Sequence, residues 1–259
     1  MEIGISMFGD LRLNKQTNTY QAPQQRLNEL IEEIKLMDQV GLDVFGIGEH
    51  HRPDYAVSTP DIILAAAASV TEKIKLTSAV TVLSSNDPVR VYQSFSTIDL
   101  LSKGRAEITV GRGSFIESFP LFGYNLDDYN ELFTEKLNLL LNINATEEPL
   151  TWTGKHRASL QAQQVFPRAE KPLDVWIAAG GTPESVLRAA KLGLPLVFAI
   201  IGGMPEQYKP FFDYYKAEYL AAGHDPKAMQ IATHSHGLVG VDGSQLSKEY
   251  FDLYKGQMD

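Results

Sequence analysis

A glycine-rich segment followed by hydroxyl side chains is typical of a phosphate-binding loop. It runs from Ala179 to Ser185, between an apolar run and a helical pattern. Gly180 and Gly181 would let the backbone approach a ligand closely, and the free N–H groups at the start of a helix favour an anion. The hydroxyl groups of Thr182 and Ser185 are within reach of the same point. Because the lysine of a triphosphate-binding loop is absent, the segment predicts a simple phosphate site, with a tight turn and an ordinary helix cap as the alternative.

Arg112 is a second candidate phosphate ligand. It lies between two glycines, directly after another apolar run. A guanidinium group can bind a phosphate through two parallel hydrogen bonds. A surface ion pair is an equally good explanation of this residue from the sequence.

Two adjacent histidines, His50 and His51, follow Glu49 at the end of an apolar run. Histidine titrates near neutral pH and can act as an acid, a base or a hydrogen-bond donor to a reacting oxygen. Adjacent side chains of an extended strand point to opposite faces, so we expect one histidine to be functional and the other structural. A metal site completed by His234 and His236 is the rival interpretation, but the sequence supplies no further ligand at a convincing spacing.

These candidate residues follow strand-like runs that alternate with helical patterns along nearly the whole chain. Seven such βα units predict a parallel sheet, and the polar residues fall after the strands, where the loops of a barrel build an active site. An open doubly wound sheet competes with the barrel, but the first strand lacks the glycine fingerprint of a dinucleotide-binding sheet. The predicted strands are 3–8, 44–48, 74–83, 105–110, 173–179, 196–201 and 231–241.

Several signals mark where the helices begin and end. A proline follows Thr59, Asp87 and Thr182, and proline is well tolerated at the first position of a helix. An earlier apolar stripe at spacings of three and four ends at Gly41, a typical helix stop. Tyrosines and phenylalanines between residues 208 and 219 also have helical spacing, which indicates a core or dimer face rather than a cofactor site.

The chain reads as one domain, residues 1–259, without a glycine-rich or proline-rich linker. The irregular segment at about 147–172 predicts a small inserted hairpin. Acidic residues outnumber basic ones by 32 to 23, the net charge is −9, and no basic cluster is present, which argues against nucleic acid as a partner. The lack of cysteine excludes disulfides and thiolate chemistry, and the lack of a long apolar run predicts a cytoplasmic protein without membrane attachment.

The ordered set of motifs resembles the bacterial luciferase-like, flavin-dependent monooxygenases. The resemblance covers nearly the whole chain and implies a TIM (β/α)8 barrel that uses reduced FMN and O2 to oxygenate a small organic substrate. The matching segments are 3–8, 49–51, 78–83, 87–90, 101–105, 111–113, 179–183 and 193–195.

Individual roles follow from the same resemblance. His50 is similar to the catalytic histidine of the family, and no metal ligand is implied. Ala79 and Val80 resemble the site of a non-prolyl cis peptide beneath the flavin ring, whereas Gly111 replaces a reactive cysteine of luciferase itself, so light emission is not implied. The residues expected to bind the cofactor are Ala79, Val80, Arg112, Gly180, Gly181, Thr182 and Ser185.

The resemblance also implies partners. A separate flavin reductase would supply reduced FMN, deazaflavin coenzyme F420 is the alternative cofactor, and relatives are often homodimers. Family members typically run longer, so we expect the barrel to lack its eighth βα unit, which puts the activity of this chain in doubt. A non-catalytic flavin-binding protein and a metal-dependent barrel hydrolase are the competing functions.

Overall fold

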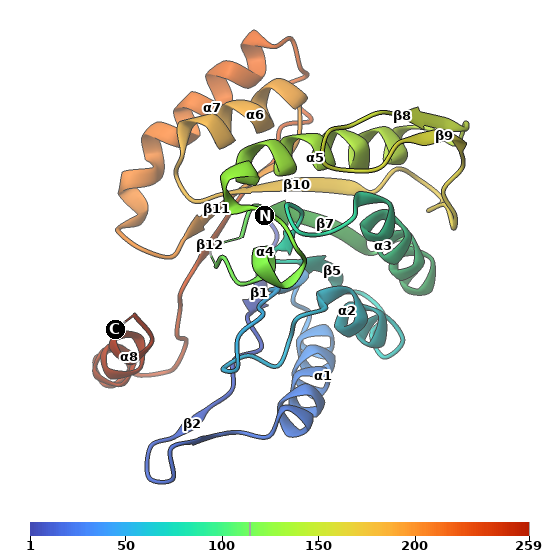
Figure 1. The fold of residues 1–259 in the computed structure, drawn as a ribbon. Helices are drawn as coiled ribbons and strands as arrows, with labels where there is room; N and C mark the ends of the chain where they lie inside the picture. The colour runs from blue at the N-terminus through green and yellow to red at the C-terminus, as the bar shows by residue number, and fades with distance from the viewer. Residues whose placement is uncertain (114, 259) are drawn as a thin grey trace.

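Parallel strands surround a common core in the order β1-β4-β5-β7-β10-β11-β12, and β6 pairs with β7 (Figure 1). The computed structural model describes residues 1–113 and 115–258, without the side chains of residues 252, 253 and 256–258. The strands are β1 Gly4–Met7, β4 Val44–Ile47, β5 Lys75–Ser78, β6 Thr81–Val82, β7 Ala106–Gly111, β10 Asp174–Ala179, β11 Leu196–Ile200 and β12 Ile231–Ser235. All seven predicted strand positions are present, so the α/β barrel is confirmed.

The barrel is not fully closed between its first and last strands. β1 pairs with β4 and β12 pairs with β11, and within the described ranges no strand occupies the position between β1 and β12. This arrangement of seven positions agrees with the expected lack of an eighth βα unit. Ile3 and Ile5 beside this opening are 56% and 40% exposed, so β1 is not covered on both faces as a parallel strand usually is.

The helices begin where the sequence signals predict. Proline occupies the first turn of α1, α2, α3 and α6, and Gly41 ends α1 with a φ of 84°, a left-handed conformation that glycine adopts without strain. Within the described residues, no helix combines the length and hydropathy that crossing a bilayer requires. The helices are α1 Pro23–Val40, α2 Pro60–Ala68, α3 Pro88–Ser102, α4 Ser118–Leu121, α5 Tyr129–Ala145, α6 Pro183–Leu192, α7 Lys209–Ala221 and α8 Gly243–Met258, with 3-10 turns η1 Leu126–Asp128 and η2 Pro205–Tyr208.

Two hairpins lie outside the barrel. The antiparallel pair β8 (Leu150–Trp152) and β9 (Leu160–Gln163) is the hairpin expected within the segment 147–172. A second pair, β2 (Leu13–Asn14) and β3 (Thr19–Tyr20), was not predicted, because two-residue strands are too short for a periodic pattern.

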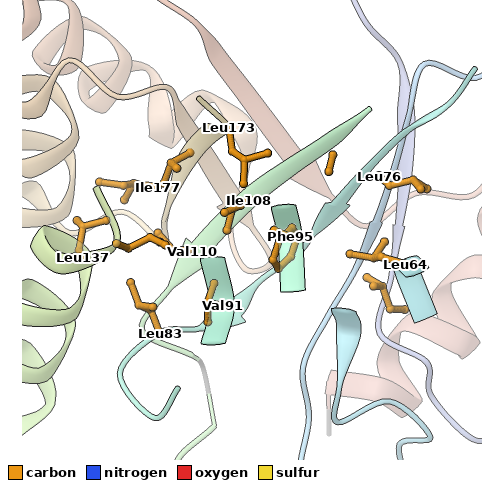
Figure 2. Packing of buried hydrophobic residues seen from close by; sticks show 14 of the residues in the cluster. Leu64, Leu76, Leu83, Val91, Phe95, Ile108, Val110, Leu137, Leu173 and Ile177 are labelled. Carbon is orange, nitrogen blue, oxygen red and sulfur yellow. The ribbon is translucent and has the colours of Figure 1, made fainter. Parts of the chain in front are cut away.

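The core fills the layer between the strands and the covering helices. Figure 2 shows Phe95 of α3 and Leu137 of α5 directed toward Ile108, Val110 and Ile177 of the central strands. Each of these side chains is at most 1% exposed, and full burial of such a side chain contributes about 1.5–3 kcal/mol. This core holds β7 and β10 rigidly, and the loops that follow these strands carry the candidate site.

Two predicted strands differ from the observed ones. The run 74–83 is divided into β5 and β6, because the peptide bond between Ala79 and Val80 is cis. The run 231–241 is strand only as far as Ser235, because its partner β11 ends at Ile200, directly opposite Ser235. Both changes occur at the carboxyl end of the barrel.

Candidate functional site

Arg112, Thr182 and Ser185 meet at the carboxyl end of the barrel. Nη2 of Arg112 donates to Oγ1 of Thr182 at 3.2 Å and to Oγ of Ser185 at 3.1 Å, and the Thr182 hydroxyl donates to Ser185 at 2.8 Å. The loop after β7 supplies the arginine, and the start of α6 supplies the hydroxyls. The two segments that the sequence singled out separately therefore form one cluster.

The start of α6 is arranged as an anion site. Thr182 is the N-cap residue, but its hydroxyl makes no capping bond and faces Arg112 instead. Gly181 has a φ of 96°, and a Cβ added to Gly180 would meet no atom within 4 Å, so open space adjoins the helix start. Guanidinium, hydroxyl and helix N–H groups are the donors that a phosphate monoester needs, and the residues present fit such a group.

Two neighbours of Arg112 were not predicted from the sequence. Asn130 accepts a hydrogen bond from Nη1 of Arg112 at 2.7 Å, and the ring of Tyr129 lies 5.0 Å from the guanidinium carbon. Burial and the charge of Arg112 lower the pKa of Arg188, which stacks over Phe133 at 5.3 Å. A second guanidinium near the cluster adds positive potential for an anion. No local motif marks these residues, because α5 and α6 meet the arginine only after folding.

The cis peptide adjoins a glycine that leaves room for it. A Cβ added to Gly111 would lie 2.7 Å from Cγ2 of Val80, closer than real Cβ contacts. The cis bond between Ala79 and Val80 is present, as the family resemblance implies, while the contact of these residues with a flavin ring stays a prediction. Ser114, which follows the Arg112 loop, lies outside the described residues.

The carboxylate of Glu49 is buried and accepts hydrogen bonds from three neighbours. The donors are Nε2 of His51 at 3.0 Å, the backbone N–H of Val82 at 2.9 Å, and the side-chain amide of Asn86 at 3.1 Å. The Glu49 side chain is only 3% exposed. It thus ties the loop after β4 to β6 and the turn that follows it. The sequence drew attention to Glu49 but gave no sign of Val82 or Asn86 as its partners.

His50 lies in an aromatic cage. Its ring stacks on Tyr55 at a centroid distance of 4.2 Å and meets Phe8 and Phe115 edge to face at 5.2 and 5.3 Å. Both ring nitrogens are buried and have no hydrogen-bond partner among the described residues. Burial and, secondarily, the charge of Arg52 lower the pKa of His50 to about 4, so the ring is neutral at pH 7.

Both adjacent histidines line the same open cleft of about 340 Å³, together with Arg52, Tyr55, Ala56, Ser58 and Leu121. Their rings have different neighbours, because His50 lies among Phe8, Tyr55 and Phe115 whereas the ring of His51 meets Phe122 edge to face at 5.3 Å and contacts Glu49. The expectation of one functional and one structural histidine stays a prediction. β4 ends at Ile47, so the alternation of an extended strand does not reach the histidines. Arg52, which also lines the cleft, donates two 3.0 Å hydrogen bonds to Asp54. The carboxylate of Asp54 therefore neutralises the positive charge of Arg52.

The rival metal interpretation loses support from the geometry. In the described part of the chain, the group of three potential ligands is Asp128, Glu131 and His156, and Lys155 already forms an ion pair with Glu131 at 2.6 Å. His236 instead packs its ring against Phe8 at 6.3 Å. His234 and His236 are not brought into a three-ligand group with the histidines of the cleft.

The aromatic series on and before α7 belongs to the core, as expected. Tyr208, Tyr215 and Tyr219 are buried, and Phe211 and Phe212 pack against the same core. Phe198 of β11 is fully buried beside Tyr208 and Phe212. Phe8 and Phe115, by contrast, surround His50.

Comparison with known proteins identifies the family. A sequence profile of luciferase-like monooxygenases matches residues 1–259. The chain therefore belongs to the luciferase-like monooxygenase family. It is 30% identical over 187 residues to N-acetyl-S-alkylcysteine monooxygenase of Bacillus subtilis, covering 71% of this chain and 54% of that protein. It is 26% identical over 220 residues to the alkanal monooxygenase alpha chain of Photorhabdus laumondii, covering 80% and 58%. The chain spans about half the length of the curated relatives it matches.

Solved structures share the fold at lower identity. A monooxygenase from Streptomyces bottropensis superimposes with a TM-score of 0.85 at 22% identity, covering 97% of this chain and 76% of that one. The oxygenating component of 3,6-diketocamphane monooxygenase from Pseudomonas putida, solved with FMN, gives 0.81 at 20% identity, covering 100% and 75%. An F420-dependent secondary alcohol dehydrogenase gives 0.72 at 20% identity, covering 90% and 68%. Neighbours of this fold thus bind flavin-type cofactors of both kinds.

Proposed function

We propose that this chain is the barrel of a flavin-dependent monooxygenase that uses reduced FMN and O2 to oxygenate a small organic substrate. The observation that carries the proposal is the cluster of Arg112, Thr182 and Ser185 at the start of α6, which offers the donor set of an FMN phosphate. Membership of a family of monooxygenases supplies the reaction class. The Glu-His-His run favours FMN over the deazaflavin.

Reduced FMN supplies the chemistry of oxygen activation when it is bound, and the protein supplies position and surroundings. Arg112, Thr182 and Ser185 would hold the phosphate, with Gly180 and Gly181 giving the backbone close approach. Ala79 and Val80 would lie beneath the flavin ring. These seven assignments remain predictions.

His50 is proposed to contact the reacting groups as a neutral imidazole, which can donate one hydrogen bond and accept another. The aromatic rings of Phe8, Tyr55 and Phe115 around it would exclude water, which limits the unproductive loss of activated oxygen. The paired charges of Arg52 and Asp54 make the cleft suited to an uncharged substrate rather than to an ion.

The proposal includes partners. A separate flavin reductase would deliver reduced FMN, in the cytoplasm, where reduced nicotinamide is regenerated. A homodimer is proposed through α1 and α2, which pack together and expose Leu36, Val40 and Ile62 at 58%, 67% and 63%. Sedimentation velocity of the wild type and of Leu36→Glu checks the dimer; a monomeric wild type would remove this part of the proposal.

The function is tested by adding chemically reduced FMN and air to the protein with a panel of an alkanal, a bicyclic ketone and an alkyl thioether. We expect mass spectrometry to detect a product that has gained one oxygen atom from ¹⁸O2, and less hydrogen peroxide than free reduced FMN forms. Tight FMN binding without substrate oxygenation would instead support a non-catalytic flavin-binding protein. Elemental analysis of the purified protein tests the metal-dependent hydrolase.

A further inference from the structure

We propose that His51, oriented by the carboxylate of Glu49, is the residue that transfers a proton in the cleft. The role in turnover rests on the proposed monooxygenase function, but the protonation pattern that makes it possible does not. The family resemblance implies the catalytic role for His50, and strand alternation predicted a structural role for one of the two histidines. In the structure both residues border one cleft, and their rings have different surroundings.

The hydrogen bonds of Glu49 determine which ring nitrogen of His51 carries the proton. Two of the polar groups that contact this carboxylate can only donate, namely the Val82 N–H and the Asn86 amide, and Nε2 of His51 is the third contact. An ionised carboxylate accepts all of them, whereas a protonated one would need an acceptor in its place. Nε2 of His51 therefore carries a hydrogen, and in the neutral ring the lone pair lies on Nδ1.

His51 is well placed to use that lone pair. The residue borders the cleft, its side chain is 9% exposed, and Nδ1 makes no hydrogen bond to a residue that the structure describes. The imidazolium that forms when Nδ1 takes a proton is stabilised by the buried charge of Glu49, 3.0 Å from Nε2. A buried carboxylate orients and supports the histidine of serine proteases in the same manner.

His50 lacks each of these features. No carboxylate contacts its ring, both nitrogens are buried, and aromatic rings surround it. Its pKa of about 4 makes the protonated form scarce at neutral pH. His50 can therefore donate or accept a hydrogen bond, but no carboxylate contacts it that would stabilise a full positive charge on the ring.

The proton balance is simple. An O–H of the reacting groups, such as that of the hydrate of a carbonyl substrate, gives its proton to Nδ1, Nε2–H remains on Glu49, and the proton returns to the product or to water. The charged and titratable groups around His51 are Glu49, His50, Arg52 and Glu117. Because Asp54 neutralises Arg52, Glu49 is the dominant charge in contact with the ring. Glu49 is thus a positioning residue that acts through His51.

Nitrogen NMR of ¹⁵N-histidine-labelled protein tests the protonation pattern without flavin or substrate. The signals of the His51 ring are assigned because they disappear in His51→Gln. We expect them to show hydrogen on Nε2 and not on Nδ1 at high pH. In Glu49→Gln, the new oxygen must face the Val82 N–H and Asn86 donors, so its NH2 group faces His51 and the hydrogen moves to Nδ1. Hydrogen on Nδ1 in the wild type, or no change in Glu49→Gln, would overturn the proposal.

The role in turnover is tested with His51→Gln, whose amide can still donate to Glu49 and keep the loop in place. We expect kcat for the best panel substrate to fall about 100-fold or more, with KM and reduced-FMN affinity changed less than about twofold. Imidazole added to His51→Ala should restore part of the rate. The matched control is His156→Gln, which removes a histidine paired with Glu131 at 3.2 Å on the outer hairpin and should leave the rate unchanged.

The NMR experiment and the turnover experiment distinguish failure of the His51 proposal from failure of the proposed function. Wild-type turnover that survives in His51→Gln would overturn the proton-transfer role and leave the monooxygenase function standing. Loss of FMN affinity in parallel with kcat would show a structural role and equally overturn the proposal. If the wild type oxygenates no substrate, the proposed function fails and the turnover role fails with it, whereas the NMR result still decides the protonation of His51.

Discussion

Arg112 reaches Thr182 and Ser185 at 3.2 and 3.1 Å, although 70 and 73 residues separate them in the chain. The side chains that accept hydrogen bonds from Arg112 are uncharged, and Arg188 adds a second guanidinium nearby, with Glu184 as an acidic neighbour of that second group. At the scale of single residues, the affinity for a phosphorylated cofactor should therefore depend strongly on Arg112.

Arg112→Ala should weaken the binding of reduced FMN about 10- to 100-fold, because a charge-assisted hydrogen bond contributes about 1.5–3 kcal/mol. Anaerobic fluorescence titration measures this change. Arg112→Lys is the matched control: it keeps the charge but loses the planar fork, so its affinity should lie between those of the other two proteins. Equal affinity in wild type and Arg112→Ala would remove the phosphate assignment.

His50 makes stability depend on pH. Its folded pKa of about 4 lies below the usual 6.5, so between these values the unfolded chain binds more protons and the free energy of unfolding rises with pH. Between about pH 7.5 and about pH 5, protonation of unfolded His50 should cost the wild type about 2 kcal/mol, as an order of magnitude.

Urea unfolding of wild type and His50→Gln at these two pH values checks this prediction. The substitution should remove the His50 contribution and flatten the pH dependence by about 2 kcal/mol. Burial also lowers the pKa of His234, but that residue is present in both proteins and cancels in the comparison. An identical pH dependence in the two proteins would show that the His50 ring is not desolvated.

At the scale of elements, three helix starts look alike in the sequence and differ in the structure. Asp87, Thr59 and Thr182 all precede a proline. Only the Asp87 side chain caps its helix, accepting from Val89 N–H at 2.9 Å and Arg90 N–H at 3.3 Å. The two threonines make no capping bond, and the Thr182 hydroxyl accepts a hydrogen bond from Arg112 instead.

Asp87→Ala should therefore lower the free energy of unfolding by about 1 kcal/mol, mainly through loss of the N-cap of α3, because the half-exposed ion pair of Asp87 with Arg157 at 3.1 Å contributes less. Thr59→Ala is the matched control and should change it by less than about 0.5 kcal/mol, the usual range for a surface substitution. Chemical denaturation of both variants measures the difference. Equal losses would mean that the observed cap bonds do not contribute to stability.

At the scale of the whole molecule, stability should be distributed unevenly around the barrel. β7 is buried along its full length and has neighbours on both sides, whereas β1 is mostly exposed and, among the described residues, pairs only with β4. Edge amides open without disrupting the core, because few apolar contacts hold them.

Hydrogen–deuterium exchange with mass spectrometry should show the slowest exchange in β7 and β10 and much faster exchange in β1 and β12. The contrast should persist when reduced FMN is present, since the phosphate cluster lies on the β7 and α6 side. Protection of β1 equal to that of β7 in the protein alone would indicate that another segment or chain covers the open edge.

The sequence alone determined the features that depend on local patterns. Alternating apolar runs and helical stripes predicted seven βα units, prolines and Gly41 marked helix ends, and the Gly180-to-Ser185 segment indicated an anion site. Family motifs located the cis bond at Ala79–Val80. Each of these signals lies within a few neighbouring residues, where backbone preference and side-chain periodicity act directly.

Tertiary structure alone decided which side chains share an environment. Glu49 contacts Val82 and Asn86 across 33 and 37 residues, because the loop after β4 lies beside β6 and the turn that follows it. Arg112 contacts Asn130 across 18 residues, because the start of α5 lies beside the loop after β7. β4 ends at Ile47, so strand alternation does not fix the two histidines, and folding places His50 among aromatic rings and His51 beside the buried carboxylate of Glu49. Burial lowers the pKa of His50, because charge and desolvation depend on the folded surroundings and not on residue type.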